Sequence, residues 1–112
     1  MDYANINYVG NKKDIGNCHI YREYGEKSFL LKHIGKHSPD GFQWGYGGSG
    51  PAETALCVLR DFIKLTGESV ADYNFVDNNY QQFKWDFISK IDGDLKINGY
   101  DIFQWIKNVK NN

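Results

Sequence analysis

Residues 37–52 read H-S-P-D-G-F-Q-W-G-Y-G-G-S-G-P-A, and this stretch decides how the rest of the chain is arranged. It contains five of the twelve glycines and both prolines of the chain. Glycine reaches positive φ at little cost and proline fixes φ at about −65°, so this density of both residues predicts a loop of defined shape. The loop leads directly into the longest helical pattern in the sequence.

That pattern, residues 51–65, has apolar side chains at spacings of three and four, which predicts an amphipathic helix. Gly50 is suited to the N-cap, Pro51 to the first helical position, and Glu53 to the third, near the positive end of the helix dipole. Gly67 is suited to the C-terminal stop. The apolar residues spread over more than one side, so we expect this helix to be the central packing element.

A glycine-rich loop that ends at a helix N-terminus can bind an anion, because several backbone N–H groups converge there. Gly45, Gly47 and Gly50 also fit the dinucleotide-binding pattern G-x-G-x-x-G, but no parallel strand–helix–strand unit surrounds them. Two interpretations remain open: a less specific phosphate site, and a purely structural loop. On the first, the candidate ligand-binding residues are His37, Ser38, Trp44, Gly45, Tyr46, Gly47, Gly48, Ser49 and Gly50.

The composition predicts one folded domain over residues 1–112, with a polar and mobile N-terminal segment at 1–16. The net charge of −1 gives no general attraction to nucleic acid or to an anionic membrane. No apolar run is long enough to span a membrane. The N-terminus has no apolar leader, so we expect a cytoplasmic protein in which Cys18 and Cys57 are reduced and buried.

Alternating and aromatic residues at 18–24 and 28–34 predict two strands joined by a turn. Leu30 and Leu31 are adjacent, so only one can face the core, and we expect another element to cover the other. A short strand or extended linker is predicted at 94–97.

Helical spacing recurs at 80–91 and 99–109, and Asn98 is suited to the N-cap of the last helix. Trp85 and Trp105 lie off the apolar stripes of these two helices. We therefore expect both rings at the surface, as candidate partner-binding residues. The fold class that follows is α+β: a small antiparallel β region followed by about three helices.

The segment from His37 to Leu56 resembles the signature of a small family of unknown function found in phages, plasmids and other mobile elements of bacteria. Residues 80–85 (Y-Q-Q-F-K-W) and 101–105 (D-I-F-Q-W) extend the resemblance over most of residues 18–106. The resemblance implies a bacterial or phage cytoplasmic setting and accessory roles such as countering host defence. It brings no catalytic residues.

Catalytic and metal-binding patterns are weak in this chain. Ser49 lacks the glycine two positions later that a nucleophile elbow requires, which argues against a catalytic set with His37 and Asp40. His33 and His37 are four apart, but Gly35 between them disfavours the helix on which they would share a face. We therefore predict no catalytic residue, no metal site and no cofactor.

Three functions from different classes remain. The first is a stoichiometric binding protein that counters a bacterial defence system, by docking on a defence protein or by sequestering a nucleotide signal at the glycine-rich loop. The second is a regulatory or structural interaction module without a ligand. The third is an enzyme acting on a nucleotide or another phosphorylated compound. Eighteen aromatic residues exceed what so small a core can bury, so a homodimer is also compatible with the sequence.

Overall fold

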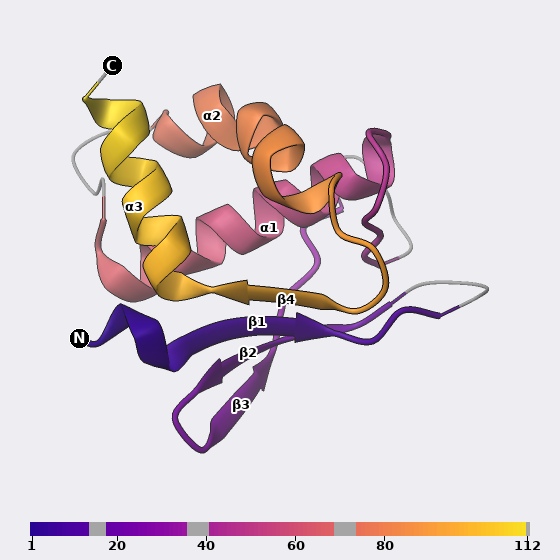
Figure 1. The fold of residues 1–112 in the computed structure, drawn as a ribbon, viewed down its shortest axis with the longest axis horizontal. Coiled ribbons are helices and arrows are strands. Elements are labelled where there is room, and N and C mark those ends of the chain that lie inside the picture. The colour runs from indigo at the N-terminus through magenta and orange to yellow at the C-terminus, as the bar shows by residue number, and fades with distance from the viewer. Residues whose placement is uncertain (14–17, 36–40, 69–73, 112) are drawn as a thin grey trace.

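A computed structural model describes residues 1–13, 18–35, 41–68 and 74–111, and it has the α+β architecture that the sequence predicts (Figure 1). Four strands form one antiparallel sheet, and the helices of the described residues lie on one side of it. The elements in chain order are a 3₁₀ helix η1 (Tyr3–Asn5), β1 (Ile6–Gly10), β2 (Ile20–Tyr24), β3 (Lys27–Leu30), α1 (Ser49–Thr66), α2 (Phe75–Phe83), a π-helix η2 (Lys84–Ile88), β4 (Leu95–Asn98) and α3 (Gly99–Lys110).

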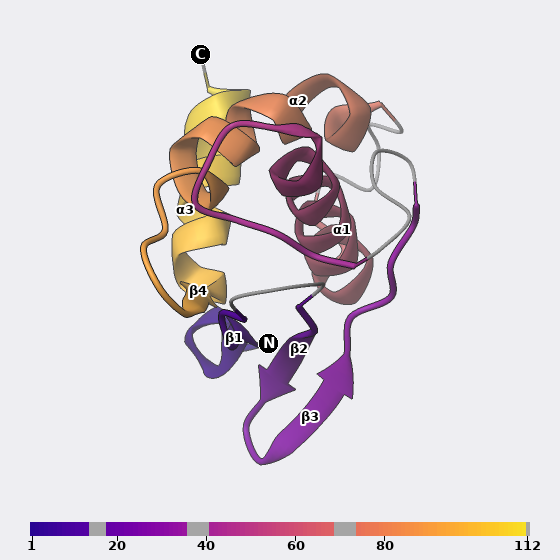
Figure 2. The ribbon, with the colours of Figure 1, turned by 90° about the vertical axis from the view of Figure 1, so that its right-hand side faces the viewer.

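The strands are ordered β3-β2-β1-β4, so the first strand of the chain lies in the middle of the sheet beside the last. Residues of β1 alternate between buried and half-buried, and Leu95 and Ile97 of β4 are buried while Lys96 is exposed. This alternation means that one face of the sheet packs on the helices and the other is open. The β2–β3 hairpin extends beyond the helices in Figure 2.

The N-terminal segment is structured where the sequence predicted a polar, mobile stretch. Within residues 1–13, η1 is capped by the Asp2 side chain, and β1 pairs with both β2 and β4. Ile6 and Tyr8 are completely buried. The strand is difficult to recognise because Asn7 interrupts its apolar letters and because β4, one of its two partners, lies at the other end of the chain.

Helix α1 is the central packing element, as predicted, but it begins earlier. Its N-cap is Gly48 rather than Gly50, so Pro51 occupies the third helical position. Proline is tolerated there because the N–H groups of the first turn have no partner within the helix. The C-terminal stop at Gly67 is confirmed, with φ +77° and an N–H bonded to the carbonyl of Ile63.

The second helix begins at Phe75, not at Tyr80, and continues into the π-helix η2. The sequence therefore missed its first five residues, which read as a polar connection because Asp77, Asn78 and Asn79 look like turn residues. The predicted strand at 94–97 and the predicted last helix are confirmed as β4 and α3, and Asn98 caps α3 by accepting the N–H of Tyr100.

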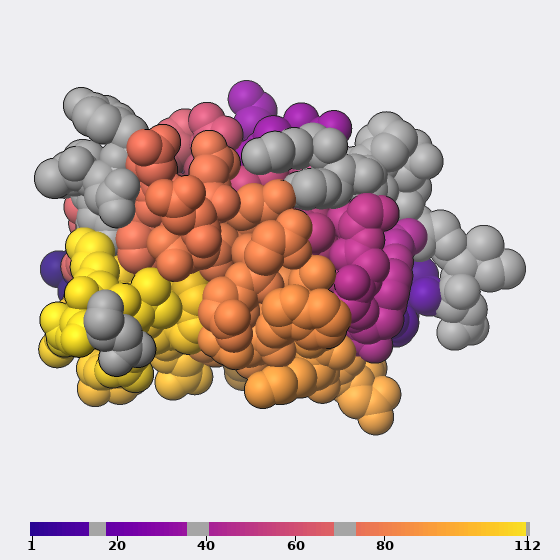
Figure 3. Space-filling view, turned by 90° about the horizontal axis from the view of Figure 1, so that it is seen from above, coloured from indigo at the N-terminus to yellow at the C-terminus, as the bar shows by residue number. Residues whose placement is uncertain are grey.

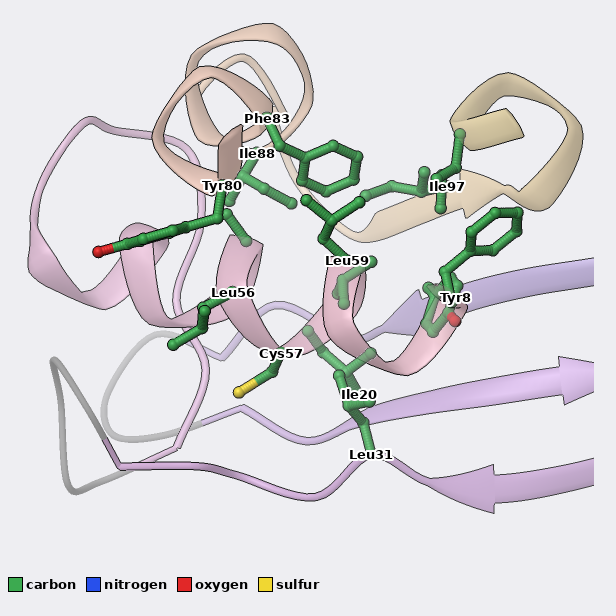
Figure 4. Close-up of a cluster of buried hydrophobic side chains, with 14 of the residues drawn as sticks. Tyr8, Ile20, Leu31, Leu56, Cys57, Leu59, Tyr80, Phe83, Ile88 and Ile97 are labelled. Carbon is green, nitrogen blue, oxygen red and sulfur yellow. The ribbon is translucent and has the colours of Figure 1, made fainter. Parts of the chain in front are cut away.

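The core lies between the sheet, α1 and the α2–η2 segment (Figure 4). Leu56 and Leu59 of α1 belong to one buried cluster with Ile20 on the sheet side and Phe83 on the helical side. Both cysteines are buried and unpaired, as expected. No helix in the described part of the chain has the length and apolar character needed to cross a membrane.

Candidate functional site

Within the described part of the glycine-rich loop, Trp44 belongs to the core. Trp44 is completely buried and its indole N–H donates to the carbonyl of Gly93 at 2.7 Å. Gly45 has φ +91°, and a Cβ there would lie 2.9 Å from the carbonyl oxygen of Ile91. This glycine is therefore required by both conformation and space. Trp44 and Gly45, two of the predicted ligand-binding residues, hold the loop against the end of η2.

Further along the loop, aromatic rings pack directly against two of the glycines. A Cβ at Gly47 would overlap the ring of Trp85, and one at Gly48 would lie 2.6 Å from the Tyr46 ring. Gly47 does not have positive φ, so its role is to leave room for the ring. Figure 3 shows the loop and the η2 segment side by side at the surface. Tyr46 and Trp85 remain about half exposed.

Side chains also cover the start of α1. The hydroxyl of Tyr46 donates to Gln43 Oε1, and Gly50 is buried beneath these two side chains. Ser49 is exposed at the first helical position. Of the predicted ligand-binding residues, Trp44 to Gly50 are thus contiguous at this end of α1, whereas His37 and Ser38 lie outside the described residues.

The two tryptophans predicted at the surface differ. Trp85 is 50% exposed and its ring lies under the Lys84 ammonium, which is 4.3 Å from the ring centroid. Trp105 is only 9% exposed, so the expectation of a surface ring is wrong for it. It packs against the rings of Phe83 and Phe87, and its N–H donates to Asp86. The reason is that α3 is covered by α2–η2 as well as by the sheet.

A cavity of about 650 Å³ lies at the opposite end of α1, between that helix, β2 and the segment after β3. This cavity was not predicted from the sequence. Its size falls within the range of roughly 300–1,000 Å³ that ligand pockets occupy. The lining residues are Arg22, Leu31, Lys32, His33, Ile34, Cys57, Arg60, Asp61, Lys64 and Leu65.

One wall of the cavity is a network centred on Asp61. This carboxylate accepts two hydrogen bonds from the Arg22 guanidinium, at 2.8 and 2.9 Å, and a third from the hydroxyl of Tyr8 at 2.7 Å. Burial, together with the charge of Asp61, raises the pKa of Tyr8 far above its usual range, so Tyr8 stays protonated and donates. Asp61 is therefore fully engaged by Arg22 and Tyr8.

Beneath the cavity, the buried carboxylate of Glu53 attaches the segment after β3 to α1. It accepts the backbone N–H groups of Ile34 and Gly35, at 3.1 and 2.7 Å, and the Cys57 thiol at 3.2 Å. His33 Nδ1 lies 3.7 Å away. Burial raises the pKa of Cys57 to about 12, so its thiol is protonated at neutral pH. Glu53 therefore acts as a structural anchor here and no longer serves as the first-turn acid that the sequence predicted.

The remaining charges of the cavity are cationic. Lys32, Arg60 and Lys64 line it and make no hydrogen bond or ion pair with any described residue. Arg22 is neutralised by Asp61, which leaves these three side chains as an excess of positive charge. Lysine and arginine at such a site favour phosphate or carboxylate groups. The cavity is thus suited to an anionic small molecule.

The only sequence signal for this cavity was local. Arg60 and Lys64 are four residues apart on the predicted helix, which places two cations on one exposed face. The other wall comes from residues 22 and 31–34, and nothing in the sequence indicates that they lie against this face. Among the described residues, no group of three histidine, cysteine, aspartate or glutamate side chains could hold a metal ion.

The geometry defines a small α+β protein with an aromatic surface at one end of its central helix and a basic cavity at the other. A family model matches residues 8–108, so the chain belongs to DUF6166, a family of unknown function. No curated protein and no solved structure matches the chain.

Proposed function

We propose that this chain is a non-catalytic binding protein that sequesters a nucleotide-type anion in the basic cavity beside α1. In this proposal it is a protein of phage or mobile-element origin, works in the cytoplasm of a bacterial host, and counters a defence system by removing its signal. The cavity replaces the glycine-rich loop as the preferred site. The observation that carries the proposal is the set of three cations, Lys32, Arg60 and Lys64, without partners among the described residues.

The dimensions of the cavity support a nucleotide rather than a single phosphate. About 650 Å³ accommodates a base and sugar as well as a phosphate group. Leu31, Ile34 and Leu65 supply apolar lining next to the cations. Mixed apolar and cationic lining is what a molecule with a flat organic part and an anionic end requires.

Binding without turnover is favoured over catalysis by the state of the one thiol in the cavity. Cys57 is the candidate nucleophile there, but burial raises its pKa to about 12, and its proton is held against the Glu53 carboxylate. A thiol in this state is a poor nucleophile at neutral pH. The enzyme hypothesis therefore has less support than sequestration.

The test is a thermal-unfolding screen of the whole chain against pyrophosphate, mononucleotides, cyclic nucleotides and ADP-ribose. A ligand at 100 times its dissociation constant stabilises the fold by about 2.7 kcal/mol, which raises the midpoint by several degrees in a chain of this size. The cavity variant is Arg60→Gln/Lys64→Gln. The matched control is Lys90→Gln/Lys96→Gln, which removes the same charge from exposed positions outside the cavity lining.

We expect at least one compound to shift the wild type and the control, and the shift to disappear in the cavity variant. An equal loss in both variants would show a net-charge effect and contradict a cavity site. A flat response across the panel would contradict nucleotide sequestration. Conversion of the bound compound, followed by mass spectrometry, would contradict the non-catalytic part of the proposal.

A second candidate function is docking on a defence protein through Tyr46 and Trp85. The observation that favours it is the placement of these two half-exposed rings on adjoining segments, supported by glycines that leave room for them. Rings of this kind are common anchors at protein interfaces. A partner captured from a host lysate by the wild type should be lost with Trp85→Ala and kept with the cavity variant.

A further inference from the structure

Strand β3 is the edge of the sheet, and its four residues are all exposed. Figure 2 shows no described element on its outer side. Of the two adjacent leucines, Leu31 is the one that faces the core. The expectation that another element covers the other is not met among the described residues, because Leu30 is 57% exposed. Phe29 is 46% exposed. An edge of this kind, with apolar side chains and without proline, is open to pairing with another strand.

The direction of its backbone groups follows from the ladder with β2. The N–H of Leu31 donates to the carbonyl of Ile20, so residues 31, 29 and 27 exchange hydrogen bonds with β2. In an antiparallel pair the alternate residues point their N–H and C=O groups the other way. Ser28 and Leu30 therefore present unpaired backbone groups outward.

We propose that a second copy of this chain occupies this edge, by antiparallel pairing of β3 with β3 about a twofold axis at Phe29. Ser28 then lies opposite Leu30 of the partner subunit, and their outward backbone groups form the new hydrogen bonds. Phe29 faces Phe29 of the partner subunit in a close, non-hydrogen-bonded pair. The result is one eight-stranded sheet.

Charge selects this register over its neighbours. Glu26 lies in the turn just before β3 and Lys32 lies two residues after its end. With Phe29 on the axis, Glu26 comes opposite Lys32 of the partner subunit at the end of the paired strands, and symmetry repeats the pair on the other side. Shifting the pairing by two residues in either direction separates these charges. Opposite charges directly across a sheet stabilise a pair, and like charges destabilise it. The edge is thus complementary to itself in backbone, charge and aromatic contact.

The open face of the sheet adds to the same assembly. Val9 pairs with Tyr21, and Tyr21 pairs with Leu30, so these three side chains form an apolar stripe across the open face. Tyr21 is 42% exposed. Pairing of the two edges places Leu30 opposite Ser28 of the partner subunit and diagonal to Leu30 of the partner subunit, so the two stripes lie offset by two residues and part of Leu30 is buried in each copy.

The first test is the mass of the full chain in solution, by sedimentation at about 1 to 500 µM without ligand. We expect a dimer at the upper concentrations. Ser28→Pro should weaken it at least tenfold, because proline removes an outward N–H that β2 does not use; Ser28→Ala is the matched control. A monomer at every concentration would overturn the proposal, as would a dimer that Ser28→Pro leaves unchanged while its circular dichroism stays native.

The second test addresses the register by exchanging charges. Glu26→Lys and Lys32→Glu should each weaken the dimer by roughly tenfold, through two like-charge pairs, and the double variant should restore it. Failure of the double variant to recover would contradict this register. These measurements need no ligand. In the dimer Lys32 is paired with Glu26 of the partner subunit, which leaves Arg60 and Lys64, the two residues that the cavity variant changes, as the unpaired cations of the cavity.

A cysteine on the axis gives a direct readout. Phe29→Cys should form a disulfide-linked dimer on oxidation, because opposed residues of a non-hydrogen-bonded pair lie about 4.5 Å apart at Cα. Leu30→Cys is equally exposed but lies opposite Ser28, too far from its own symmetry mate to cross-link. Cross-linking of Leu30→Cys alone would assign a different register. The natural cysteines are both buried and do not compete.

Discussion

The two ends of α1 differ in whether the side chains around them have partners within the protein. At its N-terminal end, the glycines leave room for the rings of Tyr46 and Trp85, and Trp44 closes the core. At its C-terminal end, Arg60 and Lys64 line a cavity and form no ion pair with any described residue. The first arrangement pairs its own groups, whereas the second leaves exposed cations without a partner among the described residues. Cations gathered beside a cavity are a stronger indication of a ligand than an unusual density of glycine.

The largest effect on stability is expected at the N-terminal end of α1, where the side chains have partners within the protein. Trp44→Ala should lower the free energy of unfolding by about 3–5 kcal/mol, because it removes a completely buried ring and its hydrogen bond to Gly93. The cavity variant Arg60→Gln/Lys64→Gln should change it by less than about 0.5 kcal/mol. Urea denaturation of both proteins measures the contrast. Similar costs for the two would mean that the cavity residues are structural as well.

A smaller loss of stability tests why glycine is needed beside the ring of Trp85. Gly47→Val should cost about 1–3 kcal/mol, since the added side chain overlaps the ring of Trp85. Most of this cost should vanish in a Trp85→Ala background. A double-mutant cycle in urea gives the coupling between the two positions. Additive costs would contradict crowding by the Trp85 ring as the reason for the glycine.

The thiol beside the cavity makes stability dependent on pH in the alkaline range. The folded state raises the pKa of Cys57 from 9.0 to about 12, so the folded chain keeps a proton that the unfolded chain loses. The stabilisation is therefore complete below pH 9 and is lost as pH rises towards 12. Urea midpoints over this range should fall less steeply for Cys57→Ala than for the wild type. Parallel curves would contradict the assignment.

The smallest effect distinguishes the two ends as ligand sites. Ser49→Ala should change the free energy of unfolding by no more than about 0.5 kcal/mol, because the side chain is exposed at the first position of α1 and is not the N-cap. Affinity for any nucleotide found in the screen should also be unchanged. A loss as large as that caused by Arg60→Gln/Lys64→Gln would return the glycine-rich loop to the position of anion site.

What the sequence could predict depended on how local the signal was. The periodicity of α1 and α3 and the hairpin around Gly25 are local patterns, and all three are confirmed. Strand β1 was missed because one of its partners, β4, lies at the other end of the chain, and no local pattern around Asn7 indicates that pairing.

The candidate site shows the same limit more strongly. The loop from Trp44 to Gly50 is a continuous motif, so the sequence could place it at the start of α1. The sequence could not predict which of its glycines lie under aromatic rings. The cavity needs Arg22 and Lys32 to meet Arg60 and Lys64, which only the tertiary fold arranges. Trp105 was misplaced because helical spacing identifies one buried face, and α3 has two.

The pairing of β1 with β4 has a consequence for synthesis of the chain. Asn7 lies opposite Asn98, so about ninety residues must follow the first strand before its second neighbour exists. At roughly 5–20 residues per second, one long edge of β1 stays open on the ribosome for several seconds. β2 and β3 can pair almost at once. Until β4 is made, both β3 and β1 are open edges of the sheet, so we expect this interval of synthesis to be the one in which aggregation or chaperone binding occurs.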